Sequence, residues 1–203
     1  MRSFWRLPIV ATLACGGALA MAGSREGAGV RTGASDPDAA QQTASPPRAD
    51  QDADLVGQAV TRHLRINLRV GQPAAVPGTR ATLVAEVVPA ARMHVYSPGQ
   101  QNYISVELKL AASPSYKPAP PVFPEPKSLY LEAIRETVQV YDAPFRITQV
   151  VTLADTPDLR RRASGREALA IAGTFRYQAC DDTVCYRPET TPLTWKVALA
   201  RGK

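Results

Sequence analysis

Apolar and polar residues alternate along several short segments of the chain, and this alternation restricts its fold more than any other feature. In the first of these segments, Leu64, Ile66, Leu68 and Val70 are separated by polar residues. A period of two places the apolar side chains on one face of a β-strand and the polar ones on the other. The segment is therefore predicted to be a half-buried strand.

Similar segments recur along the chain, and proline and glycine residues separate many of them. No convincing amphipathic helix lies between them. About eight short strands without helices are typical of an all-β protein, and we predict a β-sandwich. The predicted strands cover residues 64–70, 79–88, 93–97, 104–110, 137–141, 145–153, 168–177 and 193–199.

Three segments do not fit the alternation. Residues 113–126 contain six prolines, which exclude a helix or a central strand and predict an extended crossing between the two sheets. The helix-like window 129–136 is short and borders these prolines, so a loop or a single turn is expected there. Arg160, Arg161 and Arg162 form the only run of basic residues and are predicted to lie in a solvated loop.

The N-terminal residues 1–22 have the features of a secretory signal peptide. Arg2 and Arg6 give a positive start, an apolar run follows, and small residues near Ala22 provide a cleavage site. The apolar run has about 14 residues, whereas a membrane-spanning helix needs about 20. Two alternatives stay open, namely a retained membrane anchor and a lipoprotein anchored at Cys15. The sequence thus predicts export to the periplasm.

Residues 23–60 are predicted to be a disordered linker, followed by one domain over residues 61–203. Up to residue 54 this segment lacks Leu, Ile and aromatic residues, so it cannot bury enough apolar surface to offset the entropy of ordering. Loss of Arg2 and Arg6 with the signal peptide lowers the net charge from +6 to +4. This modest, scattered charge predicts no nucleic-acid partner.

Cys180 and Cys185 are the two cysteines that remain after removal of the signal peptide, and an oxidising compartment favours a disulfide between them. They lie between two predicted strands and hence on a hairpin. Such a short loop gains roughly 2 kcal/mol from its disulfide, against about 4 kcal/mol for a bridge between distant strands. This difference favours a redox-active disulfide, although a structural disulfide stays possible.

The residues around these cysteines resemble a known family. Residues 177–180 read Tyr-Gln-Ala-Cys and are followed by Cys185-Tyr186, Pro188 and Thr190. This pattern resembles the active-site segment of the N-terminal periplasmic domain of the thiol:disulfide interchange reductase DsbD. Residues 93–97 and 138–141 resemble two further strands of that family, and the resemblance covers roughly residues 60–200. It implies an immunoglobulin-like β-sandwich.

The resemblance implies a function in thiol:disulfide exchange and electron transfer, within cytochrome c biogenesis. Cys180 and Cys185 are the implied catalytic residues, with Cys185 bonding to the partner and Cys180 resolving the mixed disulfide. The implied partners are a thioredoxin-like donor domain or membrane reductase, expected on a separate protein, and periplasmic thiol proteins as acceptors. A monomer without a cofactor is expected. The alternative is a non-catalytic β-sandwich binding module with a structural disulfide.

Several other residues are candidates to line the site. His94 is interpreted either as a strand residue with a satisfied hydrogen bond or as a pocket residue that tunes the thiols together with Tyr96. The charges of two aspartates are expected to raise the pKa of a neighbouring thiol. The family places an aromatic ring over its disulfide, at a position that corresponds here to Ile134, with Tyr130 and Leu131 as substitutes. The predicted lining residues are His94, Tyr96, Asp181, Asp182, Tyr186 and Ile134.

The sequence predicts no metal site, because Met93, His63, His94 and the two cysteines do not lie at metal-ligand spacings. Motifs of hydrolases, phosphate-binding loops and dinucleotide-binding folds are also missing from the sequence. Thiol chemistry is therefore the chemistry that the sequence favours.

Overall fold

The computed structural model describes residues 55–100, 102–132 and 135–202. The predicted signal peptide and residues 23–54 of the predicted linker lie outside the described residues. Within them the chain forms short strands and one helix, α2 (Pro157–Ser164), which lies between β9 and β10. The strands are β1 (Gly57–Val60), β2 (Leu64–Val70), β3 (Arg80–Pro89), β4 (His94–Tyr96), β5 (Glu107–Leu110), β6 (Tyr116–Pro118), β7 (Lys127–Leu131), β8 (Glu136–Tyr141), β9 (Phe145–Leu153), β10 (Ala168–Tyr177), β11 (Ala179–Cys180) and β12 (Glu189–Ala198).

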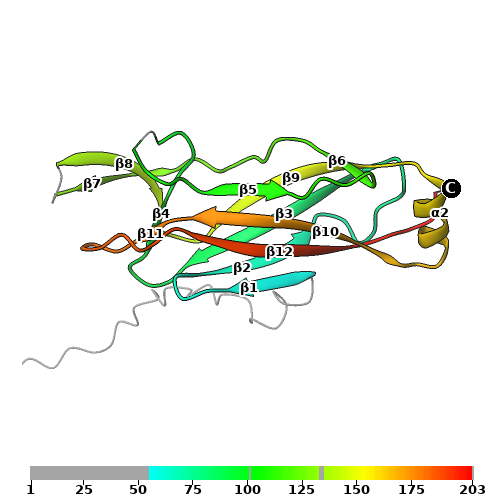
Figure 1. Ribbon diagram of the computed structural model, residues 1–203, viewed down its shortest axis with the longest axis horizontal. Coiled ribbons are helices and arrows are strands. Elements are labelled where there is room, and N and C mark those ends of the chain that lie inside the picture. The colour runs from blue at the N-terminus through cyan, green and yellow to red at the C-terminus, as the bar shows by residue number, and fades with distance from the viewer. Residues whose placement is uncertain (1–54, 101, 133–134, 203) are drawn as a thin grey trace, which may run out of the picture. The chain divides into compact units, whose positions relative to one another are not determined.

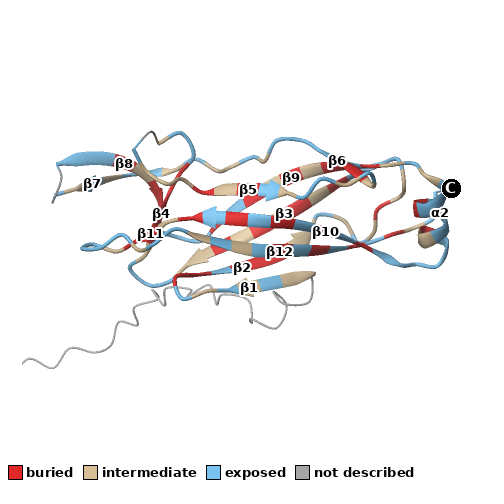
Figure 2. Ribbon diagram, in the orientation of Figure 1, coloured by how far each residue is buried: buried red, intermediate tan, exposed pale blue. Residues whose placement is uncertain are grey.

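Two antiparallel sheets form the sandwich. One has the order β1-β2-β3-β9-β6 and the other the order β12-β10-β5. Their strands alternate between buried and exposed residues, and the buried side chains form the main core (Figure 2). The indole Nε1 of the fully buried Trp195 in β12 donates a hydrogen bond to the carbonyl oxygen of Val84 in β3, at 3.1 Å. The predicted all-β sandwich is confirmed.

A third, smaller sheet has the order β11-β4-β8-β7. It lies at one end of the sandwich, where the β7–β8 hairpin and the hairpin that follows β11 both project, whereas α2 and the C-terminus lie at the other end (Figure 1). Tyr96, Val138, Val140 and Cys180 form a buried group in this sheet that is separate from the main core. We call these four residues the site cluster.

The structure contains each of the predicted strands, with some differences in length. The prediction of a loop or single turn over residues 129–136 is wrong, because this window belongs to the β7–β8 hairpin. Leu129 pairs with Val138 and Leu131 pairs with Glu136. Within the proline-rich segment, β6 pairs with the edge of β9, as an extended crossing from the second sheet to the first requires.

Ordered structure also begins before the predicted boundary at residue 61, because β1 pairs with β2 over residues 57–60. This strand was not anticipated, since its sequence Gly-Gln-Ala-Val contains little apolar surface. Main-chain pairing with the adjacent β2, rather than burial of large side chains, positions it at the edge of the sheet.

The prediction of a solvated loop at residues 160–162 is wrong, because the three arginines lie in α2. Thr156 caps the helix by accepting a hydrogen bond from the Leu159 amide at 3.3 Å, and Pro157 occupies the first turn. Leu159 and Ala163, four residues apart, are the buried side of the helix. No helix among the described residues has the length and apolar character to cross a membrane.

Candidate functional site

Cys180 and Cys185 form a disulfide with an S–S distance of 2.12 Å. Cys180 ends β11, and the two cysteines face each other in an isolated antiparallel bridge. Two main-chain hydrogen bonds, Asp181 N to Val184 O and Tyr186 N to Ala179 O, both 2.9 Å long, close the hairpin on either side of this bridge. The predicted pairing and its location on a hairpin are thus both present.

The two sulfur-bearing residues differ in exposure. Cys180 is 1% exposed and belongs to the site cluster, whereas Cys185 is exposed to solvent. Cys185 is thus the end of the disulfide that is open to solvent. Because disulfide exchange depends on access to the attacked sulfur, the two cysteines are not equivalent for such a reaction.

The hydroxyl of Tyr96 in β4 lies beside both sulfurs, 3.5 Å from Sγ of Cys180 and 3.6 Å from Sγ of Cys185. A disulfide sulfur carries no proton, so in this state the hydroxyl is the donor. Tyr96 is 1% exposed, and this burial, with the charge of Glu136, raises the pKa of its hydroxyl. The group therefore stays protonated at neutral pH and available as a donor to sulfur.

His94 lies opposite Cys180 in the β4–β11 register. Its ring meets Tyr96 edge to face, with 5.7 Å between ring centroids. Burial lowers the pKa of His94, which keeps the imidazole neutral at pH 7, and its buried Nε2 has no hydrogen-bond partner. His94 therefore packs against Tyr96 beside Cys180, and its Nε2 lacks the hydrogen bond that the first interpretation expected.

Asp181 fixes the shape of the hairpin. Its Oδ1 accepts hydrogen bonds from the amides of Thr183 and Val184, at 2.8 and 2.7 Å, and its Oδ2 accepts one from the hydroxyl of Tyr186, at 2.9 Å. The Thr183 amide, followed by that of Val184, contributes most to lowering the pKa of Asp181. The carboxylate therefore holds the four residues between the cysteines in one conformation.

This lowered pKa makes the hairpin sensitive to acid. A carboxylate whose pKa is lower in the folded than in the unfolded state stabilises the fold at pH values above its unfolded-state pKa, which is about 3.9. This stabilisation is lost as the pH falls towards the folded-state pKa. We expect the thermal unfolding midpoint of Asp181→Asn to fall less than that of the wild type between pH 5 and pH 2. Asp182→Asn is the matched control, because it removes the next carboxylate and its ion pair with Arg92 but none of these amide contacts. Equal slopes for Asp181→Asn and the wild type would contradict this role.

Asp182 and Tyr186 make contacts beyond the hairpin. Asp182 forms an exposed ion pair with Arg92, at 3.0 Å. The Tyr186 ring packs on the ring of the buried His63, with centroids 4.4 Å apart, and His63 Nδ1 in turn lies 2.9 Å from Glu189 Oε1. Tyr186 therefore connects the segment after Cys185 to the sandwich. Both aspartates remain negatively charged, and their charges act on the neighbouring His94.

The β7–β8 hairpin contributes apolar side chains at the site cluster. Leu129 and Leu131 pack against the site cluster, whereas Tyr130, on the other face of β7, is 51% exposed. Of the two predicted substitutes for a covering ring, Leu131 therefore contacts the site and Tyr130 does not. Ile134 lies outside the described residues.

An aromatic ring that the sequence analysis missed packs against the site cluster. Tyr103, in the connection between β4 and β5, stacks on Tyr96 with 4.3 Å between centroids and 27° between planes. Its hydroxyl donates a hydrogen bond to Glu136 Oε2, at 2.8 Å. No local motif marks Tyr103 in the sequence, because it reaches the site through the path of the chain after β4.

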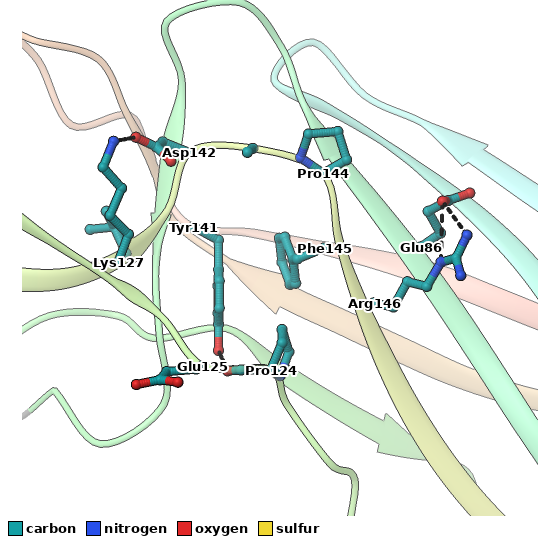
Figure 3. A pocket seen from close by; sticks show the side chains of 11 residues that line it. Glu86, Pro124, Glu125, Lys127, Tyr141, Asp142, Pro144, Phe145 and Arg146 are labelled. Atoms are coloured by element: carbon teal, nitrogen blue, oxygen red, sulfur yellow. Dashed lines mark hydrogen bonds and ion pairs between the residues drawn. The ribbon is translucent and has the colours of Figure 1, made fainter. Parts of the chain in front are cut away.

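Among the described residues no group of three or more His, Cys, Asp or Glu side chains could hold a metal ion. A separate pocket of about 540 Å³ lies at the corner between β8 and β9, beside the stacked rings of Tyr141 and Phe145 (Figure 3). Lys127 pairs with Asp142 at 2.5 Å on one side of it, and Arg146 with Glu86 at 3.3 Å on the other. Because these charged side chains pair with each other, they do not indicate a ligand for the pocket. The cysteines do not line it.

The fold and the site together define an antiparallel β-sandwich domain that carries a disulfide on a hairpin at one end. The family model described as "Thiol:disulfide interchange protein DsbD, N-terminal" matches residues 67–195, which is more than half of the chain. The chain therefore belongs to the family of DsbD N-terminal domains and is a domain related to thiol:disulfide exchange. The resemblance identified from the cysteine segment is confirmed.

Solved structures of such domains are similar to the chain. The N-terminal periplasmic domain of ScsB from Proteus mirabilis has a TM-score of 0.49 and 13% sequence identity, with 70% of this chain and 52% of that chain covered. The N-terminal domain of Neisseria meningitidis DsbD in the reduced form has a TM-score of 0.34 and 17% identity, with coverages of 61% and 82%. The chain thus spans about half the length of the ScsB structure. No curated protein matches the sequence at a significant level.

Proposed function

We propose that this domain passes reducing equivalents from a thioredoxin-like donor domain, or a membrane reductase, to periplasmic thiol proteins through Cys180 and Cys185. The observation that carries the proposal is the unequal exposure of the two cysteines. Cys185 is exposed, whereas Cys180 is buried and its Sγ lies 3.5 Å from the Tyr96 hydroxyl. A disulfide with one accessible end and a stabilised leaving group is suited to exchange with another protein. Membership of the DsbD N-terminal family supports the same reaction class.

In the first half of the proposed reaction, a thiolate of the donor attacks Cys185 Sγ in line with the S–S bond. The bond to Cys180 breaks, and Cys180 leaves as a thiolate next to the Tyr96 hydroxyl. The donor's second thiolate then attacks its own sulfur in the mixed disulfide and releases Cys185. The donor becomes a disulfide, and the pair on this domain gains two electrons and, from solvent, two protons.

In the second half, the Cys185 thiolate attacks the disulfide of an acceptor protein and displaces one of its thiolates. Cys180 then attacks Cys185 Sγ, displaces the second acceptor thiolate and restores the disulfide of the domain. The acceptor gains the two electrons that the donor supplied and takes up two protons from solvent. Cys185 is therefore the residue that bonds to both partners, and Cys180 resolves the bond to the acceptor.

Tyr96 and His94 have supporting roles in this proposal. A hydrogen bond from the protonated Tyr96 hydroxyl stabilises negative charge on the departing Cys180 sulfur. The neutral His94 adds no positive charge beside the thiols, so it does not lower a thiol pKa in the way that a protonated histidine would. These features suit a disulfide that conducts electrons in either direction rather than a strong oxidant.

The proposed compartment is the periplasm, which the protein reaches through the signal peptide of residues 1–22. A lipoprotein anchored through a lipid at Cys15 is the alternative to cleavage at Ala22. Membership of the DsbD N-terminal family supports this location. A role in cytochrome c biogenesis and a monomeric state belong to the same proposal. They follow from the family rather than from a contact in this domain.

The redox equilibrium of the purified mature domain tests the proposal. The domain is equilibrated in graded thiol/disulfide buffers, its free thiols are alkylated, and the products are weighed. A midpoint above about −270 mV is expected for an exchangeable disulfide. A bond that stays closed below about −300 mV would mark a structural disulfide and favour a non-catalytic binding module.

A further inference from the structure

Tyr103 has no part in the reaction described above, although it makes the closest aromatic contact with the tyrosine that touches the disulfide. Its ring lies 4.3 Å from the Tyr96 ring, centroid to centroid, in a stacked geometry. Its hydroxyl is bound to Glu136, the first residue of β8, at 2.8 Å. Tyr103 thus joins the connection after β4 to the β7–β8 hairpin, and it does so directly over Tyr96.

The position of the Tyr96 hydroxyl depends on what confines its ring. The edge-to-face contact with His94 limits the ring on one side, and the stacked Tyr103 ring limits another. The hydroxyl lies 3.5 Å from Cys180 Sγ, a hydrogen-bonding distance for sulfur. A tilt of the ring would lengthen and weaken this contact.

We propose that Tyr103, held by Glu136, is a positioning residue that keeps the Tyr96 hydroxyl on the Cys180 sulfur and so sets the rate of disulfide exchange. The inference rests on the proposed function, because it assigns Cys180 as the departing sulfur. Because Cys185 is already exposed, loss of Tyr103 does not speed exchange by giving better access to the disulfide. Losing Tyr103 therefore slows exchange.

The hydrogen bond with Glu136 is the part of this arrangement that a conservative substitution can remove. It raises the pKa of Tyr103 to about 12, so the Tyr103 hydroxyl remains a donor throughout the neutral range. Tyr103→Phe keeps the stacked ring and removes the bond, Glu136→Gln keeps an acceptor without the charge, and Tyr103→Ala removes both ring and bond. These three variants separate stacking from hydrogen bonding.

The test is the second-order rate constant for reduction of the purified domain by dithiothreitol, measured from alkylation of the released thiols. We expect Tyr103→Phe to be slower than the wild type by about threefold and Tyr103→Ala by about tenfold, with Glu136→Gln closer to the wild type. Tyr130→Phe is the matched control, because it removes a hydroxyl from the exposed face of β7. It should react at the wild-type rate.

A double-mutant cycle with Tyr96→Phe distinguishes positioning from a general effect on stability. If Tyr103 acts through the Tyr96 hydroxyl, Tyr103→Phe has no further effect on the rate in the Tyr96→Phe background. An unchanged or faster rate in both Tyr103 variants, or an undiminished effect in that background, would overturn the inference and leave the proposed function intact. A wild-type disulfide that dithiothreitol does not reduce in the folded domain would overturn both.

Discussion

Cys180→Ala is expected to accumulate a mixed disulfide at Cys185 when it is incubated with oxidised glutathione, whereas Cys185→Ala should form almost none. The remaining thiol of Cys180→Ala is exposed, and no second thiol is left to displace glutathione from it. The remaining thiol of Cys185→Ala is buried in the site cluster, where the probe cannot approach it. We expect a difference in rate of at least about a hundredfold, since reaction requires access of the thiolate to the incoming disulfide. Intact mass after acid quenching measures it.

The wild-type domain in its reduced form is the matched control for these two variants. It should react at Cys185 and then release glutathione as its own disulfide closes, so little adduct remains. Circular dichroism and the thermal unfolding midpoint establish that each variant is folded when it is tested. Equal adduct formation by the two folded variants would contradict the roles assigned from exposure.

Trp195→Ala is expected to lower the free energy of unfolding by about 3–5 kcal/mol. The Trp195 side chain is fully buried in the main core, and the substitution leaves a cavity there. It also removes the hydrogen bond to the Val84 carbonyl, which joins the two sheets of the sandwich. Equilibrium unfolding in urea, followed by circular dichroism, gives the change.

Lys196→Ala provides the control for this prediction, because Lys196 is the next residue of β12 and faces solvent. A change within about 0.5 kcal/mol of the wild type is expected for such an exposed position. If Trp195→Ala were as stable as Lys196→Ala, the indole would not be the packing centre that its burial indicates.

The sandwich was largely predictable from sequence because its strands bury one face each. In β10 and β12 the inward residues Phe175, Trp195 and Val197 alternate with polar or small ones, and a period of two is legible without any knowledge of the neighbours. Strand β8 was predicted, but its partner β7 was missed, because β7 lies at the end of the sandwich and is mostly exposed, so its alternation is weak. Helix α2 was missed although Thr156 and Pro157 form a recognisable start.

Spacing alone predicted the candidate site only where it is continuous in sequence, and the family resemblance pointed to His94 and Tyr96 in a distant strand. Both cysteines, Asp181 and Tyr186 lie within one hairpin, and short-range spacing sufficed to place them together. Tyr103 and Glu136, by contrast, meet across 33 residues. Their meeting depends on how the connection after β4 folds back over the small sheet, and no periodicity or local motif encodes that path.

The separation of the site cluster from the main core has a consequence for how such a domain can evolve. Only Tyr96, Val138, Val140 and Cys180 are buried in that cluster, whereas the sandwich draws its stability from the many residues between the two larger sheets. Substitutions at the end that carries the disulfide therefore act on a small local unit and leave the stability reserve of the sandwich intact. If this end binds exchange partners, as we propose, a lineage can change its partners there while purifying selection on folding acts mainly on the rest.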